Sequence, residues 1–340
     1  MLLAKYYSNN DIRLEEQPLP VIADDEALIK IESSGICGSD LMEWYRKDKV
    51  PLVLGHEIAG EVVEIGRKIS SFIQGDRVVA THHVPCLKCR LCQRGNETMC
   101  ETLRKTNYDP GGFSQFVRLP AINTRLGLFK IPDDMSFDEA SFAEPLACVI
   151  RSHSRISSHS DDTVVVIGSG ISGCLHIAYS RVIGCGHVLA ADINPDRLVR
   201  AKDFGADSIT TRSSDIGGIL LEKTGRLADL VIITTGNPQA IQDGIESVGK
   251  GGTVILFAPT EPDIKLNINF NKVFWKRDIT LTTSYAGSPE NIEMALHFIE
   301  SGKVPVEKMI THILPLNQIL KGFELVGTGN DSLKVIIRPN

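Results

Sequence analysis

Residues 163–198 read TVVVIGSGISGCLHIAYSRVIGCGHVLAADINPDRL, and this stretch indicates the fold more strongly than any other. Val164 to Ile167 form a continuous apolar, β-branched run, which is typical of a parallel strand covered on both faces. The turn GSGISG follows at 168–173, then a helical segment, and then a second apolar strand at 188–191. This order of strand, glycine turn, helix and strand predicts one unit of a doubly wound α/β sheet.

The glycines of the turn follow the G-x-G-x-x-G spacing of a dinucleotide-binding site. Gly168 permits the turn, Gly170 lets the backbone approach a pyrophosphate, and Gly173 allows the helix to pack closely on the strand. The backbone amides of Ile171 and Ser172 open the helix, where N–H groups are expected to face the phosphates. The segment therefore predicts a dinucleotide cofactor.

An acidic residue at the end of the second strand indicates which dinucleotide binds. Asp192 lies about 20 residues after the glycine turn, where its carboxylate can accept hydrogen bonds from the adenosine ribose and repel a 2′-phosphate. We therefore expect NAD rather than NADP. Arg197 is the residue that could weaken this preference, and the alternative is a solvated arginine at the start of a helix.

The strand pattern continues beyond this unit. Apolar segments that end in turn residues recur at 228–236 and 251–259, and the segment at 278–285 resembles them. Repeated strand–helix units over residues 148–285 predict a Rossmann dinucleotide-binding domain.

The composition argues against several classes of partner. The 340-residue chain has 36 basic and 42 acidic residues, a net charge of −6, whereas a nucleic-acid-binding protein more often presents a basic face. No segment approaches the roughly 18 apolar residues of a membrane span, and Lys5 and Asn10 interrupt what would have to be a signal peptide. We therefore expect a cytoplasmic protein with a small-molecule substrate and neither a nucleic-acid nor a membrane partner.

Four of the eight cysteines fall within CLKCRLCQRGNETMC, at 86–100. Disulfides rarely persist in the cytoplasm, and the C-x2-C-x2-C-x7-C spacing lets four thiolates converge on one tetrahedral ion. An iron–sulfur cluster is the main alternative, but the ferredoxin pattern has a shorter last gap followed by proline, and here Glu101 follows. We therefore predict a structural zinc ion with no open position. Its ligands would be Cys86, Cys89, Cys92 and Cys100.

A second group of possible metal ligands lies in GICGSD (35–40), GHEIAGEVVEIG (55–66) and FAEPL (142–146). Three protein ligands with a fourth position left for water or substrate describe a catalytic zinc site. On spacing alone, the alternative is that Cys37 is a small buried residue, His56 a hydrogen-bonded core histidine and Glu57 a solvated carboxylate. The residues concerned are Cys37, His56, Glu57 and Glu144.

Taken together, these motifs resemble those of the zinc-dependent medium-chain dehydrogenases, the superfamily of alcohol, sorbitol and threonine dehydrogenases. The resemblance covers essentially the whole chain and also includes GDRV (75–78) and GGFSQFV (111–117). It implies a β-rich, GroES-like catalytic domain at 1–147 that contains the cysteine lobe and is completed by 286–340. The Rossmann domain lies between these two segments, and each chain would bind two zinc ions and NAD.

The resemblance also implies roles for the second group. Such enzymes bind catalytic zinc through the counterparts of Cys37 and His56, and the resemblance implies that Glu57 and Glu144 alternate as the third ligand, or hold zinc-bound water in turn. The implied reaction oxidises an alcohol to a ketone or aldehyde by hydride transfer to the nicotinamide. Asp40 is expected to orient His56.

The path of the proton is less well marked. Ser39 matches the hydroxyl that begins the proton relay in many relatives, and the alternative is that it caps the following helix. Several relatives finish the relay with a histidine where this chain has Met42. His83 occupies the position of a histidine near the substrate in threonine dehydrogenases, with a structural loop histidine as the alternative, whereas we interpret His82 as structural.

The substrate can be predicted only as a class. Two glutamates in the metal group favour the polyol and threonine branch, but Ser284–Tyr285 replaces an arginine–tyrosine pair that is usual in sorbitol dehydrogenases. We expect a secondary alcohol on a polyol, sugar or sugar phosphate, with L-threonine or a general alcohol as the alternative substrate. A more remote alternative is a relative that has lost its catalytic zinc.

Relatives form homodimers or homotetramers through the edge that here includes 278–285. We interpret three further thiols as inert: Cys148, Cys174 and Cys185.

Overall fold

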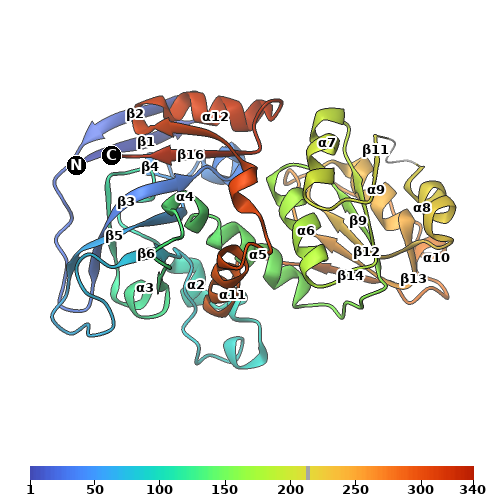
Figure 1. Cartoon of the computed structure of the whole chain (residues 1–340), viewed down its shortest axis with the longest axis horizontal. Coiled ribbons are helices and arrows are strands. Elements are labelled where there is room, and N and C mark those ends of the chain that lie inside the picture. Colours follow the sequence, from blue (N-terminus) through green and yellow to red (C-terminus); the bar gives the residue numbers. More distant parts are fainter. Residues whose placement is uncertain (212–214) are drawn as a thin grey trace. The chain divides into compact units, whose positions relative to one another are not determined.

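The computed structural model describes residues 1–211 and 215–340, which form two compact units (Figure 1). The first unit comprises Met1–Cys148, Ala286–Gly302 and Val306–Asn340, and the second comprises Val149–Tyr285 and Lys303–Pro305. The first unit is therefore built from both ends of the chain. In the described ranges, no helix is both long and apolar enough to cross a membrane.

The first unit is β-rich. Its larger sheet has the strand order β15-β16-β3-β5-β6-β8, with β7 pairing β3, and its smaller sheet has the order β2-β1-β4. The strands are β1 (Leu2–Ser8), β2 (Asp11–Glu16), β3 (Ala27–Gly35), β4 (Leu52–Val53), β5 (Glu57–Ile65), β6 (Arg77–Ala80), β7 (Phe116–Leu119), β8 (Leu128–Lys130), β15 (Ile310–Pro315) and β16 (Lys334–Arg338). The late strand β16 runs antiparallel to the early strand β3, as the red and blue arrows of Figure 1 show.

Short helices accompany the strands of this unit, and α4 and α11 begin at capping side chains. Ser136 and Glu139 form a capping box at the start of α4, and Ser288 caps α11 with Pro289 at its first position. The helices are α1 (Glu43–Arg46), α2 (Glu101–Lys105), α3 (Ala121–Leu126), α4 (Phe137–Ala140), α11 (Pro289–Glu300) and α12 (Ile319–Thr328). Helix α5 (Ala143–His153) begins in this unit and ends in the second, which starts at Val149. The 3-10 helices are η1 (Gly38–Leu41), η2 (Cys92–Arg94), η3 (Glu97–Met99), η5 (Val306–Met309) and η6 (Leu316–Gln318).

The second unit confirms the predicted doubly wound sheet. Six strands lie in the order β11-β10-β9-β12-β13-β14, and neighbouring strands are parallel. The strands are β9 (Thr163–Ile167), β10 (His187–Ala191), β11 (Ser208–Thr210), β12 (Ala228–Ile233), β13 (Val248–Leu256) and β14 (Thr280–Thr283). The helices are α6 (Ile171–Val182), α7 (Pro195–Asp203), α8 (Ile216–Thr224), α9 (Pro238–Ser247) and α10 (Phe270–Val273).

The strand order explains where this unit can bind a ligand. The chain enters at β9 and proceeds to β10 and β11 on one side, then returns to add β12, β13 and β14 on the other. Ligands of such sheets bind beyond the carboxyl ends of the strands where the order reverses, which here is between β9 and β12. The predicted glycine turn follows β9 directly and therefore lies at this point.

Two histidines form a buried pair inside the second unit. His153 Nε2 lies 3.1 Å from His176 Nδ1, and both side chains are almost fully buried. Aromatic rings enclose the pair, with Phe257 edge-on to His176 and Tyr179 edge-on to His153. Burial lowers the pKa of His153 to about 4 and that of His176 well below its ordinary value of 6.5.

We expect this pair to make stability fall in mild acid. In the unfolded chain His153 takes up a proton near pH 6.5, whereas in the folded protein burial lowers its pKa to about 4. The stability that neutral His153 contributes is therefore fully present above pH 6.5 and is lost as the pH falls from 6.5 toward 4. The loss from His153 alone is about 2 kcal/mol between pH 7 and pH 5. Denaturant unfolding at both pH values should therefore show a smaller difference for His153→Gln than for the unchanged protein. If the free energy of unfolding changed between pH 7 and pH 5 by the same amount in His153→Gln and in the control His312→Gln, this account would be contradicted.

Candidate functional site

The cysteine lobe of residues 86–100 brings its four thiols together. The ligand atoms of Cys86, Cys89, Cys92 and Cys100 all lie within 4.8 Å of one another. The Sγ atoms of Cys89 and Cys92 are 3.5 Å apart, and those of Cys86 and Cys100 are 3.6 Å apart. A tetrahedral ion with Zn–S bonds of about 2.3 Å separates its sulfurs by about 3.8 Å. The lobe therefore fits the predicted zinc ion.

Local backbone features shape this lobe. Gly95 adopts a left-handed conformation (φ 69°) that ends η2 and turns the chain back toward Cys100. Burial raises the pKa of the Cys100 thiol, but the N–H group of Cys86 and other hydrogen bonds more than offset this effect and lower the pKa to about 6. All eight cysteines lie in the described part of the chain, and none is in a disulfide.

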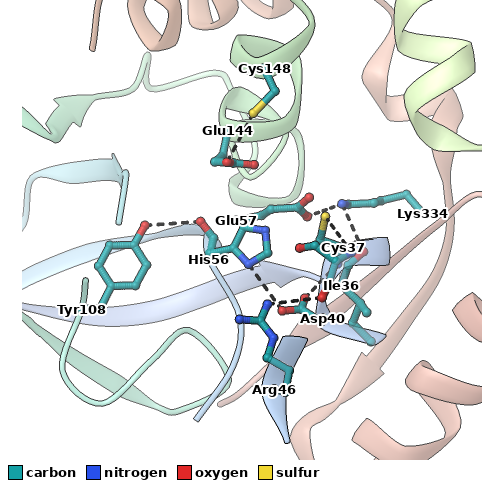
Figure 2. A network of polar contacts seen from close by, with 11 residues as sticks. Ile36, Cys37, Asp40, Arg46, His56, Glu57, Tyr108, Glu144, Cys148 and Lys334 are labelled. Carbon is teal, nitrogen blue, oxygen red and sulfur yellow. Dashed lines mark hydrogen bonds and ion pairs between the residues drawn. The ribbon is translucent and has the colours of Figure 1, made fainter. Parts of the chain in front are cut away.

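The second predicted group also converges. Cys37, His56 and Glu57 each offer a ligand atom within 4.8 Å of the others (Figure 2). The ladder between β3 and β5 places Glu57 opposite Gly35, two residues before Cys37. Gly55 makes the turn before His56 at φ 88°, and a Cβ there would overlap the backbone of Phe113. A thiolate, an imidazole and a carboxylate are ligands that Zn²⁺ prefers, so the residues present fit a zinc ion.

Asp40 fixes the orientation of His56, as expected. Its Oδ1 lies 3.4 Å from His56 Nδ1, its Oδ2 accepts a hydrogen bond from the N–H group of Cys37 at 3.0 Å, and its side chain is fully buried. This contact leaves Nε2 of His56 for a metal. Burial opposes the charged form of both groups, but their mutual attraction wins, lowering the pKa of Asp40 and raising that of His56 well above its ordinary value.

Sequence reasoning missed the partner of Glu57. The ammonium group of Lys334, 277 residues away in the chain, forms a buried ion pair with Glu57 Oε2 (Figure 2). The only signal in the sequence is a lysine within the apolar segment LKVIIR of 333–338. A charged residue in a strand that is otherwise core-like indicates a buried partner, but nothing in the sequence identifies which one.

Glu144 lies close to this group without belonging to the set of three. It is near the start of α5, and the thiol of Cys148 one turn later donates to its Oε1 at 3.5 Å. Burial raises the pKa of Glu144, while His56 opposes this shift and Glu57 adds to it. Burial and the neighbouring Glu144 also raise the pKa of Cys148 well above its ordinary value, so this thiol remains protonated, as an inert thiol would.

The two other thiols interpreted as inert are buried in the second unit. Burial raises the pKa of Cys174 to about 12 and that of Cys185 to about 11. Neither thiolate forms near neutral pH, so neither thiol is activated for reaction.

Ser39 caps neither of the helices near it. It lies inside η1, whose N-cap is Cys37, and the N-cap of the next helix, α1, is Met42. The capping alternative for Ser39 is therefore wrong, and its place in a proton relay stays a prediction. Glu43, which follows Met42 in the chain, accepts a hydrogen bond from the N–H group of Asn9 at 2.7 Å.

The two neighbouring histidines lie in an unexpected order. The ring of His82 is 4.9 Å from that of His56, and the ring of His83 stacks on His82 at 3.7 Å. His82, interpreted from the sequence as structural, is thus in ring contact with His56. Burial lowers the pKa of His83 to about 4 and that of His82 well below its ordinary value, so both imidazoles are neutral at pH 7.

The glycine turn of the second unit has the geometry that the sequence predicts. Gly168 adopts φ 96°, and a Cβ on Gly173 would overlap the Gly168 carbonyl oxygen, whereas a Cβ on Gly170 would meet no described atom within 4 Å. No side chain caps α6 at Gly170, so the amide groups of Ile171 and Ser172 begin a helix that has space for an anion.

Asp192 is tied to this turn. Its Oδ2 accepts a hydrogen bond from the N–H group of Ser169 at 2.6 Å, and its Oδ1 accepts one from Asn194 at 2.8 Å. Arg197 lies 3.9 Å from the same carboxylate. The ribose-binding carboxylate expected from the sequence therefore stands beside the glycine turn, with the arginine next to it.

The glycines give a matched pair of variants. We expect Gly173→Ala to destabilise the second unit, because the new Cβ would separate α6 from the turn. Gly170→Ala should keep the thermal unfolding temperature of the unchanged protein but weaken dinucleotide binding by about tenfold or more, because its Cβ enters the space left for the pyrophosphate. Calorimetric titration with dinucleotide measures the second effect, and unchanged affinity in Gly170→Ala would place the phosphates elsewhere.

Comparison with known proteins identifies both parts of the chain. Residues 23–133 match the family model described as alcohol dehydrogenase GroES-like domain, and residues 172–301 match the one described as zinc-binding dehydrogenase. The chain is 32% identical to sorbitol dehydrogenase of Bacillus subtilis, over 100% of this chain and 98% of that protein. It is 29% identical to L-threonine 3-dehydrogenase of Alteromonas mediterranea, over 98% of each.

A solved structure agrees with these matches. Galactitol-1-phosphate dehydrogenase of Escherichia coli superposes with a TM-score of 0.87 over 100% of each chain, at 25% identity.

Proposed function

This chain belongs to the zinc-dependent medium-chain dehydrogenase superfamily, and on that premise we propose that it oxidises a secondary alcohol on a polyol, sugar or sugar phosphate to the ketone, with NAD as the hydride acceptor. The observation that carries this proposal is the convergence of Cys37, His56 and Glu57, with Glu144 close by. We further propose two zinc ions per chain, one in this group and one in the cysteine lobe. Elemental analysis of the purified protein measures the count.

In the reaction, these residues would bind a zinc ion and orient its ligands. Cys37, His56 and Glu57 would hold a zinc ion, which supplies a Lewis acid that makes a substrate hydroxyl more acidic. Asp40 keeps His56 in the tautomer that binds metal through Nε2. Glu144, whose pKa is raised by burial, can hold a proton near the reacting hydroxyl.

Residues of the second unit would bind the cofactor, which carries the redox chemistry. The amides of Ile171 and Ser172 would bind its pyrophosphate, and Asp192 its ribose hydroxyls. Ser39 would pass the substrate proton toward solvent, and His83 would line the substrate pocket or join this relay.

The choice of NAD rests on Asp192 and can be tested there. We expect the enzyme to use NAD with a kcat/KM at least about tenfold higher than NADP, because the carboxylate of Asp192 repels a 2′-phosphate. Asp192→Ser should reduce or reverse this ratio, since the carboxylate that repels the 2′-phosphate is then gone while Arg197, 3.9 Å from Asp192 in the unchanged protein, remains to attract the phosphate. Equal use of both cofactors by the unchanged enzyme would contradict the assignment.

L-Threonine is the second candidate substrate. It is favoured by the likeness to L-threonine 3-dehydrogenase and by the row of imidazoles formed by His56, His82 and His83. A screen of NADH formation with sorbitol, galactitol 1-phosphate, 2,3-butanediol and L-threonine separates the two. Turnover of a polyol or its phosphate supports the first proposal, turnover of L-threonine alone replaces it, and the absence of turnover with all four rejects both.

We also propose that the enzyme is a homodimer or homotetramer. Strand β14 is the outer strand of the second unit's sheet, and Leu281 on it is 41% exposed, so a second copy could pair there. Sedimentation analysis measures the state, and a monomer at micromolar concentration would contradict it.

A further inference from the structure

Lys334 is a buried cation that the proposed reaction does not use. It begins β16, its side chain is 0% exposed, and its Nζ donates to Glu57 and to the carbonyl oxygen of Ile36 at 3.3 Å (Figure 2). The ring of Phe142 lies 5.6 Å from Nζ. Removing an ammonium group from water costs several kcal/mol, so Lys334 persists there because Glu57 and Ile36 bind it.

The fold leaves space for this ion pair. A Cβ on Gly35 would overlap Glu57 Oε2 and would lie 2.7 Å from Cε and 2.9 Å from Nζ of Lys334. In the sheet, Gly35 is paired with Glu57 of β5 on one side and with Ile336 of β16 on the other. The ion pair of Glu57 and Lys334 therefore occupies the space that a side chain at Gly35 would fill. Its φ is outside the left-handed region, so the glycine is needed here for space rather than for backbone conformation.

Glu57 is therefore shared between two cations. It is one of the three residues whose ligand atoms converge, and it also forms the ion pair with Lys334. We propose that Lys334 is a positioning residue that competes with the bound metal for the Glu57 carboxylate, so that Glu57 exchanges between the metal and the ammonium group. This inference rests on the metal site of the proposed function and adds a role for a residue outside it.

Exchange of this kind has a consequence for the fourth ligand. When Glu57 is held by Lys334, a second position would be open to water or substrate beside the one that the three ligands already leave, and the carboxylate would keep a charged partner while it is away from the metal. Without Lys334 the buried carboxylate would lose its ammonium partner, and leaving the metal would place an unpaired charge in the core. Glu57 would then stay on the metal, the metal would leave more slowly, and substrate would enter less easily.

A merely structural ion pair predicts the opposite sign. If Lys334 only braces β16 against β5, its removal disorders Glu57, and loss of such a supporting contact typically weakens metal binding by about 10–100-fold. Metal retention and turnover would then fall together. If Glu57 exchanges between the metal and Lys334, removal of Lys334 makes the metal leave more slowly while turnover falls.

The test is the rate at which metal leaves the protein for an excess of chelator. Lys334→Met removes the charge, Lys334→Arg keeps it, and Lys130→Met removes a surface lysine that pairs with Asp76 as a control. The phase of metal release that is absent in Cys37→Ser is assigned to the site formed by Cys37, His56 and Glu57. We expect Lys334→Met to slow that phase by about tenfold and to lower kcat by a similar factor, with Lys334→Arg and the control close to the unchanged enzyme.

A spectroscopic signature and a second variant keep the test decisive. With Co²⁺ in the site, the visible spectrum should change in Lys334→Met, because Glu57 remains a ligand. Gly35→Ala keeps both charges but forces them apart, so it should slow release in the same direction even if Lys334→Met does not fold. Faster or unchanged release in these variants overturns the inference alone. If no release phase depends on Cys37, the proposed metal site fails instead.

Discussion

Cys37→Ser is expected to lower turnover by at least about a thousandfold while dinucleotide affinity remains that of the unchanged enzyme. Cys37 contributes one of the three converging ligand atoms, and a weakly basic hydroxyl does not replace a thiolate for Zn²⁺. Lewis-acid stabilisation is worth several kcal/mol, and each 1.36 kcal/mol is tenfold in rate. The glycine turn belongs to the other unit, so the cofactor should still bind. Elemental analysis, steady-state rates and titration with NADH measure the three effects.

The matched control for this prediction is Cys185→Ser. Cys185 is also a free cysteine and is buried, but it lies in the second unit. It should keep both zinc ions and nearly full turnover. If Cys37→Ser retains its rate, the assignment of the catalytic metal to this group is wrong. If the two variants lose activity together, the loss reflects folding rather than chemistry.

Cys89→Ser is expected to open the cysteine lobe. Within residues 86–100, only Thr98 and Cys100 are buried, so almost no apolar core holds the lobe together. A bound ion must supply that stability, and structural zinc contributes about 10–16 kcal/mol of apparent binding free energy in small zinc domains. Loss of one sulfur should weaken zinc binding there on the order of a hundredfold or more. We expect zinc content to fall from two ions to one and a protease to cut within the lobe.

Met99→Ser is the control for the lobe, because Met99 is 43% exposed and is not one of the four converging ligands. It should keep the zinc content and the protease resistance of the unchanged protein. Full zinc content in Cys89→Ser would show that three cysteines suffice. Protease resistance with zinc removed by chelator would show that the lobe folds without a metal.

Local features of the sequence predicted local structure well. The roles of Gly168 and Gly173 could be predicted because they depend on local backbone geometry: Gly168 has φ 96°, and a Cβ on Gly173 would overlap the carbonyl oxygen of Gly168. The four thiols of the lobe could be grouped for the same reason. Cys37 and Glu57 meet because β3 and β5 pair in register, which the sequence indicates only through motifs of known relatives.

Features that depend on distant pairing could not be predicted. Lys334 reaches Glu57 because β16 pairs with the end of β3, and no periodicity in the sequence records that register. The order of His82 and His83 depends on how one loop stacks its rings, which their adjacent positions in the chain do not specify. In physical terms, short-range sterics can be read from residue types, whereas contacts between distant segments depend on the assembled sheet.

The pairing of β16 with β3 has a consequence for how the protein is made. A ribosome releases Cys37 and Glu57 long before it synthesises Lys334, and the whole second unit is translated in between. Throughout that interval the end of β3 is an open sheet edge, and Glu57 lacks its cation. A nascent chain halted before residue 286 should therefore carry a folded nucleotide domain joined to an incomplete first unit. The unpaired edge of β3 would make that unit prone to aggregation, and chaperones bind such species.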